Sequence, residues 1–193
     1  MVTDVRISLL MGPTWTRYNY CMPSPSKNKG NTWERDVAKY LTELYGENFM
    51  RAPGSGAMVG GTNAYRKQIM HEGQIRSFKG DIIPGQSFPK LNIEAKSYKD
   101  FAFHQLFTGT IIQLELWLNQ LATSADIGDV NLLIMKFNRK GKFVAFNFDE
   151  PRDYPLFVDR HFLYQSETLG TWAIMSFDKF WQLNKDGIRH LSA

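Results

Sequence analysis

Two acidic residues and a lysine near the middle of the chain have the types and spacing needed for phosphodiester hydrolysis. Asp81 precedes Glu94 by twelve intervening residues, and Glu94-Ala95-Lys96 follows an apolar position. Alternate side chains of a strand share a face, so Glu94 and Lys96 point the same way while Ala95 turns toward the core. Divalent cations such as Mg²⁺ prefer carboxylate oxygens and lower the pKa of an attacking water, and a lysine can offset charge developing on a phosphate. The pattern therefore predicts a metal-dependent hydrolytic site.

A third acid lies on the helix expected to precede this site. Apolar residues at helical spacing predict a helix that starts at Thr32 as its cap and ends at Gly46. Glu34 falls in the first turn, in line with Leu41 and Tyr45 at the edge of the apolar face. A solvated charge is unfavourable there, and a nearby cation would explain it.

Periodicity and turn residues predict the other elements. Strands are expected over 49–52, 81–83, 90–96, 130–137, 142–148 and 171–175, a buried helix over 110–122, and a final short helix from about Phe177 with Ser176 as its cap. The order predicts an α/β fold with a mixed central β-sheet flanked by helices. We expect a single domain: an arm over 1–29, a core over 30–150, and an extension over 151–193 packed on that core.

Composition narrows the class of protein. The 23 Lys and Arg against 19 Asp and Glu leave a formal charge of +4, which suits a polyanionic partner. The single cysteine, Cys21, excludes an internal disulfide framework and a cysteine-rich zinc site. No apolar run approaches a membrane span and no secretion signal is visible, so we expect a soluble, cytoplasmic protein.

The arrangement of Asp81 followed by Glu94-Ala95-Lys96 on a strand resembles the motif of the PD-(D/E)XK nuclease superfamily. The run Asn31-Thr32-Trp33-Glu34-Arg35-Asp36 and the loop Arg51-Ala52-Pro53-Gly54-Ser55-Gly56 resemble archaeal-type Holliday junction resolvases in particular. Gln113 lies in the helix after the Glu-x-Lys strand, where the superfamily often places a polar residue facing the active site.

This resemblance implies a restriction-endonuclease-like core and an Mg²⁺-dependent DNA endonuclease, with Mn²⁺ as a substitute. It implies Glu34, Asp81 and Glu94 as metal ligands, Lys96 as the catalytic lysine, and Ser55 and Gln113 as further residues of the site. It also implies branched DNA, such as a four-way junction, as the substrate, a homodimer, and a role in recombination or repair. Gly80 replaces the signature proline, which we expect to matter little. The stretch 58–79 is longer than the compact resolvases usually have, and residues 149–193 form an extension that they commonly lack.

Basic residues cluster in sequence around the predicted site, as a phosphate-contacting surface requires. Those expected to bind DNA are Lys27, Lys29, Arg35, Arg51, Arg66, Lys67 and Lys99.

Simpler interpretations stay open at this point. The Glu-x-Lys strand could be an exposed face with a salt bridge, and Glu34 could be an acid favoured by the macrodipole at a helix N-terminus. Ser55 could belong to an ordinary turn, and Gln113 could be a polar group hydrogen-bonded to the backbone. The alternatives in function are another endonuclease of the same superfamily, of restriction or recombination type, and a catalytically silent DNA-binding module.

Overall fold

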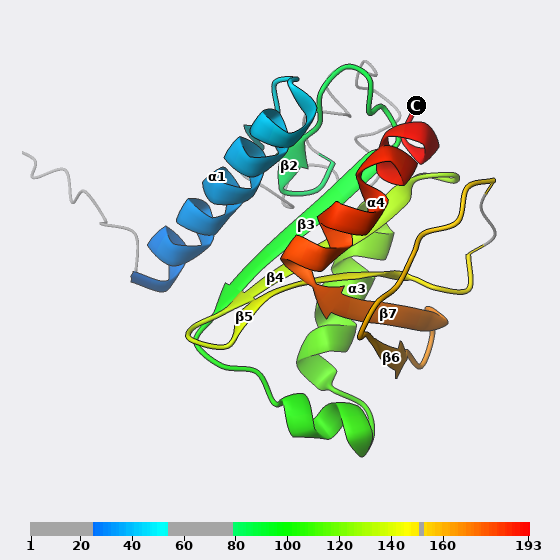
Figure 1. Cartoon of the computed structure of the whole chain (residues 1–193). Coiled ribbons are helices and arrows are strands. Elements are labelled where there is room, and N and C mark those ends of the chain that lie inside the picture. Colours follow the sequence, from blue (N-terminus) through cyan, green and yellow to red (C-terminus); the bar gives the residue numbers. More distant parts are fainter. Residues whose placement is uncertain (1–24, 54–78, 151–152) are drawn as a thin grey trace, which may run out of the picture.

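A computed structural model describes residues 25–53, 79–150 and 153–193 (Figure 1). The elements in chain order are α1 (Pro25–Tyr45), β1 (Met50–Arg51), β2 (Ile82–Ile83), β3 (Leu91–Tyr98), the 3₁₀ helix η2 (Phe103–Phe107), α3 (Ile112–Ser124), β4 (Val130–Phe137), β5 (Gly141–Asn147), β6 (Phe162–Gln165), β7 (Thr171–Ser176) and α4 (Phe177–Leu191).

The main sheet has five strands in the order β3-β4-β5-β7-β6. β3 and β4 run parallel, and every other neighbouring pair is antiparallel, so the predicted mixed sheet is confirmed. β1 and β2 form a separate antiparallel pair beside it. Residues 162–176 supply two of the five strands, of which β6 was not expected from sequence.

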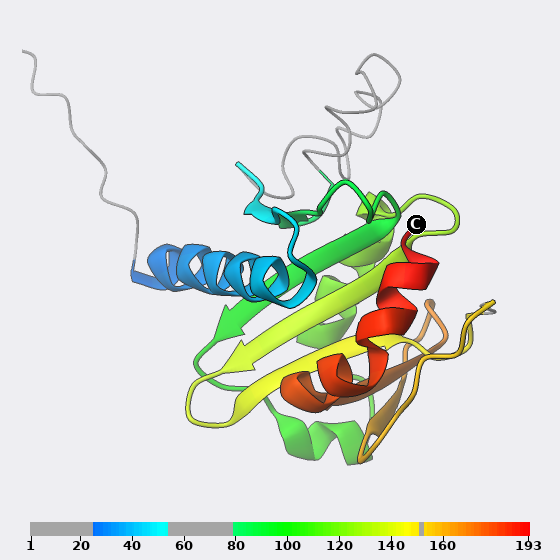
Figure 2. The same cartoon turned by 45° about the horizontal axis from the view of Figure 1, so that its top comes forward.

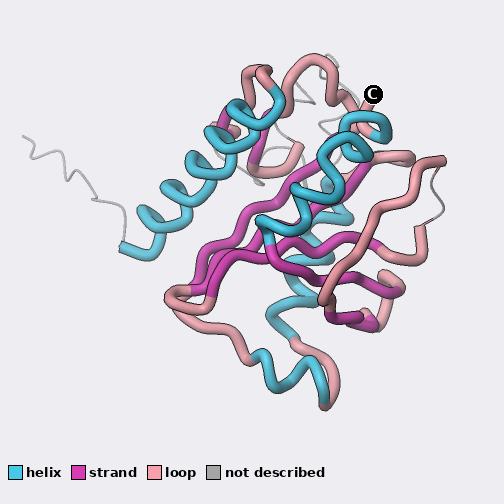
Figure 3. The backbone as a smooth tube through the Cα atoms, viewed as in Figure 1, coloured by secondary structure: helices cyan, strands magenta, loops and turns pink. Residues whose placement is uncertain are grey.

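Helices cover both faces of this sheet. α1 and α4 lie on one face and α3 lies on the other, as Figure 2 shows from above and Figure 3 shows by element type. The strand residues alternate accordingly: in β4, Leu132 and Ile134 join the core beneath α1 and α4, whereas Leu133 and Met135 join the core beneath α3. No helix among the described residues is long and apolar enough to cross a membrane.

The helix α1 starts earlier than its sequence pattern suggested. It begins at Pro25, a favoured first position for proline, and ends before Gly46, whose φ of +71° is typical of a glycine after a helix. The prediction that Thr32 caps the helix is therefore wrong. Glu34 is the tenth residue of α1 and lies within the helix, so the N-terminal dipole does not account for its position.

Aromatic packing joins α1 to α4. Tyr40 packs against Phe177 with ring centroids 4.8 Å apart, and Tyr45 meets Trp181 edge-on at 6.2 Å. The Tyr45 hydroxyl also donates to the carbonyl of Lys185 at 3.0 Å. These contacts link the C-terminal helix to the helix that carries Glu34.

Candidate active site

Asp81 sits at the free edge of β3, the outermost strand of the sheet. Its backbone N–H donates to the Ile93 carbonyl at 2.8 Å, and its Oδ2 accepts the Ala95 N–H at 2.9 Å. These two strand groups point away from β4, so Asp81 supplies bonds that a further strand would otherwise make. The carboxylate is thereby held beside the strand that carries Glu94 and Lys96.

Gly80 makes this approach possible. Its φ is +66°, and a Cβ added there would lie 2.5 Å from the Ile93 carbonyl oxygen and 2.8 Å from Asn92 Oδ1. Proline fixes φ near −65° and could not adopt this conformation, so the glycine matters for the backbone, while its small effect on the chemistry stays a prediction. Glycine is the residue that lets Asp81 reach the strand edge.

Gly80→Ala is expected to lower the free energy of unfolding by about 3 kcal/mol or more, because left-handed strain adds to a backbone clash. Gly46→Ala is the matched control: φ there is +71°, yet nothing lies within 4 Å of an added Cβ, so a loss of about 1–2 kcal/mol is expected. Urea unfolding of both variants measures the difference, and equal losses would contradict the clash.

Glu94 and Lys96 share the face of β3 that looks toward α3. Glu94 is 1% exposed, and its Oε1 accepts hydrogen bonds from Lys96 Nζ and from the side-chain amide of Gln120 on α3. Lys96 Nζ also donates to Gln120 Oε1 at 3.0 Å and lies 4.0 Å from Asp81 Oδ2. The strand thus brings Glu94 and Lys96 together with Asp81, as the sequence spacing predicted.

Glu34 reaches this cluster from α1. It is 7% exposed, and its carboxylate accepts a hydrogen bond from the guanidinium of Arg51, which also donates to Asn31 Oδ1 at 2.9 Å. Asp81 and Lys96 act on Glu34 electrostatically. Arg51 thus contacts the acidic cluster in this arrangement, and its binding of DNA stays a prediction.

The protonation of these acids follows from their crowding. Burial, and then the neighbouring charge of Asp81, raise the pKa of Glu94 to about 8, with a hydrogen bond between the two carboxyl groups adding to the effect. Burial and Asp81 also raise the pKa of Glu34. A cation can take the place of a proton that is held by buried carboxylates.

Asp81 and Glu94 offer the carboxylate oxygens that a hard divalent cation prefers. In the described ranges, no three acidic, histidine or cysteine side chains converge closely enough to hold a metal ion as they stand. Asp81 and Glu94 are the pair whose oxygens already meet, and Glu34 is turned toward Arg51. Release of Glu34 from Arg51 would add a third carboxylate.

Comparison with known proteins places the chain in a family. Residues 25–190 match the model of the family described as "Phage putative PDDEXK endonuclease". The chain belongs to this family. No curated protein and no solved structure matches it.

Membership in the PDDEXK endonuclease family agrees with the architecture and with the placement of Asp81, directly before β2, beside Glu94 and Lys96 of β3. The family implies a restriction-endonuclease-like fold, and its superfamily generally uses divalent metal ions. The match covers α1 through α4, so the C-terminal strands and helix belong to the family pattern. It does not show the expected relation to Holliday junction resolvases.

The glutamine that contacts Glu94 and Lys96 is Gln120, whereas Gln113 was the glutamine expected to face the active site. The two lie on one face of α3, seven residues and about 10 Å apart along the axis. Near Gln113, the helix end bonds to β6 instead: Tyr164 Oη accepts the Ile111 N–H at 3.2 Å and donates to Glu115 at 2.7 Å. The amphipathic pattern of α3 identifies which face of the helix packs on the sheet. Which residue along that face lies beside Glu94 depends on tertiary packing.

The remaining predicted residues fall into two groups. Arg35 and Lys99 are exposed, on α1 and just after β3. Ser55, Arg66, Lys67 and the side chains of Lys27 and Lys29 lie outside the described residues.

Lys79, directly before Gly80, is buried rather than presented to a phosphate. Its ammonium pairs with buried Asp129 and lies 3.0 Å from Asp126. Removing one partner of such a pair would leave a buried charge uncompensated, so this contact holds the segment leading into Asp81 in place.

Proposed function

We propose that this protein is a metal-dependent DNA endonuclease that cuts branched DNA. The four-way junction is the branched substrate that we favour. The observation that carries the chemistry is the meeting of Asp81, Glu94 and Lys96 at the edge of β3, with Glu34 beside them. Membership in the PDDEXK endonuclease family supports the same reaction class.

Each residue has a proposed role in phosphodiester hydrolysis. Asp81 and Glu94 would hold Mg²⁺, joined by Glu34 once Arg51 releases it, and the bound ion would supply Lewis-acid stabilisation of the phosphate and a lower pKa for the attacking water. Lys96 would orient that water and offset negative charge on the phosphate. Gln120 holds both Glu94 and Lys96, so it positions the pair rather than contacting the reacting atoms.

The choice of branched DNA rests on the sequence resemblance to junction resolvases around Glu34 and Arg51. A symmetric pair of nicks across a junction needs two active sites, so we propose a homodimer as the working form. A restriction-type endonuclease acting on duplex DNA is the competing function within the same superfamily.

The test is cleavage of labelled DNA by the purified protein in Mg²⁺ and in EDTA. We expect nicking of a four-way junction at least 10-fold faster than nicking of a duplex with the same arm sequences, with no cleavage in EDTA. Cleavage of one duplex sequence would select the restriction-type function. A protein that binds DNA but cuts none of these substrates in Mg²⁺ or Mn²⁺ would be a silent binding module.

A further inference from the structure

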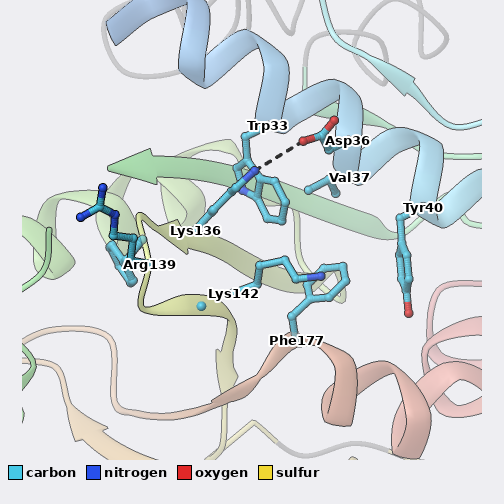
Figure 4. Close-up of a pocket in the computed structure, with 10 residues that line it drawn as sticks. Trp33, Asp36, Val37, Tyr40, Lys136, Arg139, Lys142 and Phe177 are labelled. Carbon is cyan, nitrogen blue, oxygen red and sulfur yellow. Dashed lines mark ion pairs between the residues drawn. The ribbon is translucent and has the colours of Figure 1, made fainter. Parts of the chain in front are cut away.

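A pocket outside the acidic cluster combines aromatic rings with basic side chains. It has a volume of about 500 Å³ and opens between α1, the β4–β5 turn and the start of α4 (Figure 4). That volume lies in the range of small-ligand sites, about 300–1,000 Å³. No role assigned above uses this pocket.

The floor of the pocket is aromatic. Trp33 and Tyr40 come from α1 and Phe177 from the start of α4 (Figure 4). The Phe177 ring centroid lies 4.8 Å from that of Tyr40 and 6.1 Å from that of Trp33. Tyr40 is partly exposed, whereas Trp33 and Phe177 are 4% and 2% exposed beneath Lys136 and Lys142. Aromatic rings stack on nucleobases of any sequence because every base has a π-face, and here Tyr40 is the ring that a base meets first.

The rim of the pocket is basic. Lys136 Nζ stands 4.8 Å from the centroid of the Trp33 ring, and Lys142 Nζ stands 4.8 Å from that of Phe177. Both side chains are 39% exposed, so an entering phosphate can reach them. Arg139, on the turn between their strands, is exposed as well.

Acidic neighbours weaken this basic rim only in part. Asp36 lies 3.6 Å from Lys136 and Asp178 lies 3.2 Å from Lys142. Both carboxylates are at least half exposed, and exposed pairs of this kind contribute little, so a phosphate can compete for the lysines. The lining holds three basic residues and one acidic residue, a net of +2 (3 − 1).

The pocket is within reach of the acidic cluster along one end of the sheet. Lys96 pairs in register with Met135, and the strand end at Tyr98 pairs with Phe137, directly before the β4–β5 turn. Two residues of strand and one strand spacing separate Lys96 from this turn, which amounts to about 10–15 Å. Lys96 faces α3 and the pocket lies on the opposite face of the sheet. A nucleic-acid strand would therefore pass round this end of the sheet, by exposed Lys99 and the β4–β5 turn, to reach the pocket.

We propose that this pocket binds an unpaired nucleotide of the DNA substrate next to the phosphodiester that is cut. The base would lie against the ring of Tyr40, and against those of Trp33 and Phe177 once Lys136 and Lys142 turn from the rings to the flanking phosphates. Arg139 would bind a phosphate as well. Bases within a duplex are stacked on their neighbours, so only a base freed at a branch or in a single strand can enter. This inference rests on the proposed function and specifies its substrate as DNA with unpaired nucleotides.

The first test compares DNA binding by the double variant Lys136→Gln/Lys142→Gln with binding by Lys39→Gln. Lys39 is a matched control because it lies on α1, 79% exposed, and pairs only with Glu43 four residues away among the ion pairs of the described residues. Fluorescence anisotropy in EDTA measures binding of a labelled 12-nucleotide single strand and of a 12-base-pair duplex. We expect the double variant to lose at least 10-fold affinity for the single strand, and Lys39→Gln less than 2-fold.

The salt dependence gives a second readout from the same experiment. Each phosphate contact on a single strand contributes about 0.7 to the slope of log K against log salt, so loss of two contacts should flatten that slope by about 1.4. An unchanged slope, or equal losses of affinity for single strand and duplex, would overturn the assignment of an unpaired nucleotide.

A third measurement addresses the stacking surface. Tyr40→Leu keeps an apolar side chain but removes a ring, and a 5-fold or greater loss of single-strand affinity is expected with duplex affinity unchanged. Photocrosslinking of a bromodeoxyuridine-substituted strand to wild-type protein should map to peptides that contain Trp33, Tyr40 or Phe177. Crosslinks confined to other peptides would overturn the proposal even if a variant unfolds.

These binding assays need no cleavage, so the two proposals fail separately. A wild-type protein that cuts branched DNA while the pocket variants bind single strands normally overturns the pocket alone. A wild-type protein that binds single strands through the pocket but cuts no DNA in Mg²⁺ or Mn²⁺ overturns the endonuclease.

Discussion

Asp81→Asn is expected to lower Mg²⁺-dependent DNA cleavage by about 1,000-fold or more while the fold persists. An asparagine oxygen can still accept the Ala95 N–H, so the bond that holds residue 81 to the edge of β3 survives. The substitution removes the negative charge that would hold the cation, and with it several kcal/mol of transition-state stabilisation. Single-turnover cleavage of a labelled junction at saturating protein measures the chemical step.

The control for this variant is Asp159→Asn. Asp159 is exposed and pairs at 3.7 Å with Lys179, on α4. We expect it to retain wild-type cleavage, and both variants to bind junction DNA in EDTA as the wild type does. If Asp81→Asn kept more than a tenth of wild-type cleavage, Asp81 would not be a metal ligand.

The metal-free protein is expected to lose stability as pH rises from about 5 to about 8. An unfolded glutamate releases its proton near its ordinary pKa of 4.5, whereas burial and then Asp81 raise the pKa of folded Glu94 to about 8. Between these values the folded state binds more protons than the unfolded state, so the free energy of unfolding falls by up to about 1.4 kcal/mol per pH unit. Burial and Asp81 raise the pKa of Glu34 too, which acts in the same direction.

Urea unfolding in EDTA at pH 5, 6, 7 and 8 measures this slope. Glu94→Gln should flatten it, because the side-chain oxygen that accepts from Lys96 remains while the titration is lost. Glu43→Gln, an exposed site on α1, should leave it unchanged. Since a cation would take the place of the proton, Mg²⁺ should raise Tm more at pH 8 than at pH 6. Stability that is flat or rising over this range would contradict the protonation of buried Glu94.

The sequence predicted most of the sheet because hydrophobic patterning there is local. β4 matches its expected bounds of 130–137, and β3, β5 and β7 differ from expectation by one or two residues at their ends. The short edge strand β6 and the 3₁₀ helix η2 were missed. η2 buries none of its residues and β6 buries only Tyr164, so neither shows a strong alternating or helical pattern.

The part of the candidate site that follows from strand geometry was predicted from the sequence. Alternation alone places Glu94 and Lys96 on one face, and their contact is confirmed. The contact of Gln120 with Glu94 and that of Arg51 with Glu34 were not predicted, because each depends on how separate elements meet in space. The metal-binding and catalytic roles themselves stay predictions.

The contacts between α1 and α4 also bear on the order in which the parts of the candidate site are made during translation. A ribosome that has completed residues 25–96 has already made every acid of the site, but Tyr40 and Tyr45 still lack the rings of Phe177 and Trp181. The helix bearing Glu34 packs on β3 by then, but its aromatic contacts with α4 form only after residues up to Trp181 have been translated. We therefore expect the proposed endonuclease to reach full activity only after its C-terminal helix has been translated.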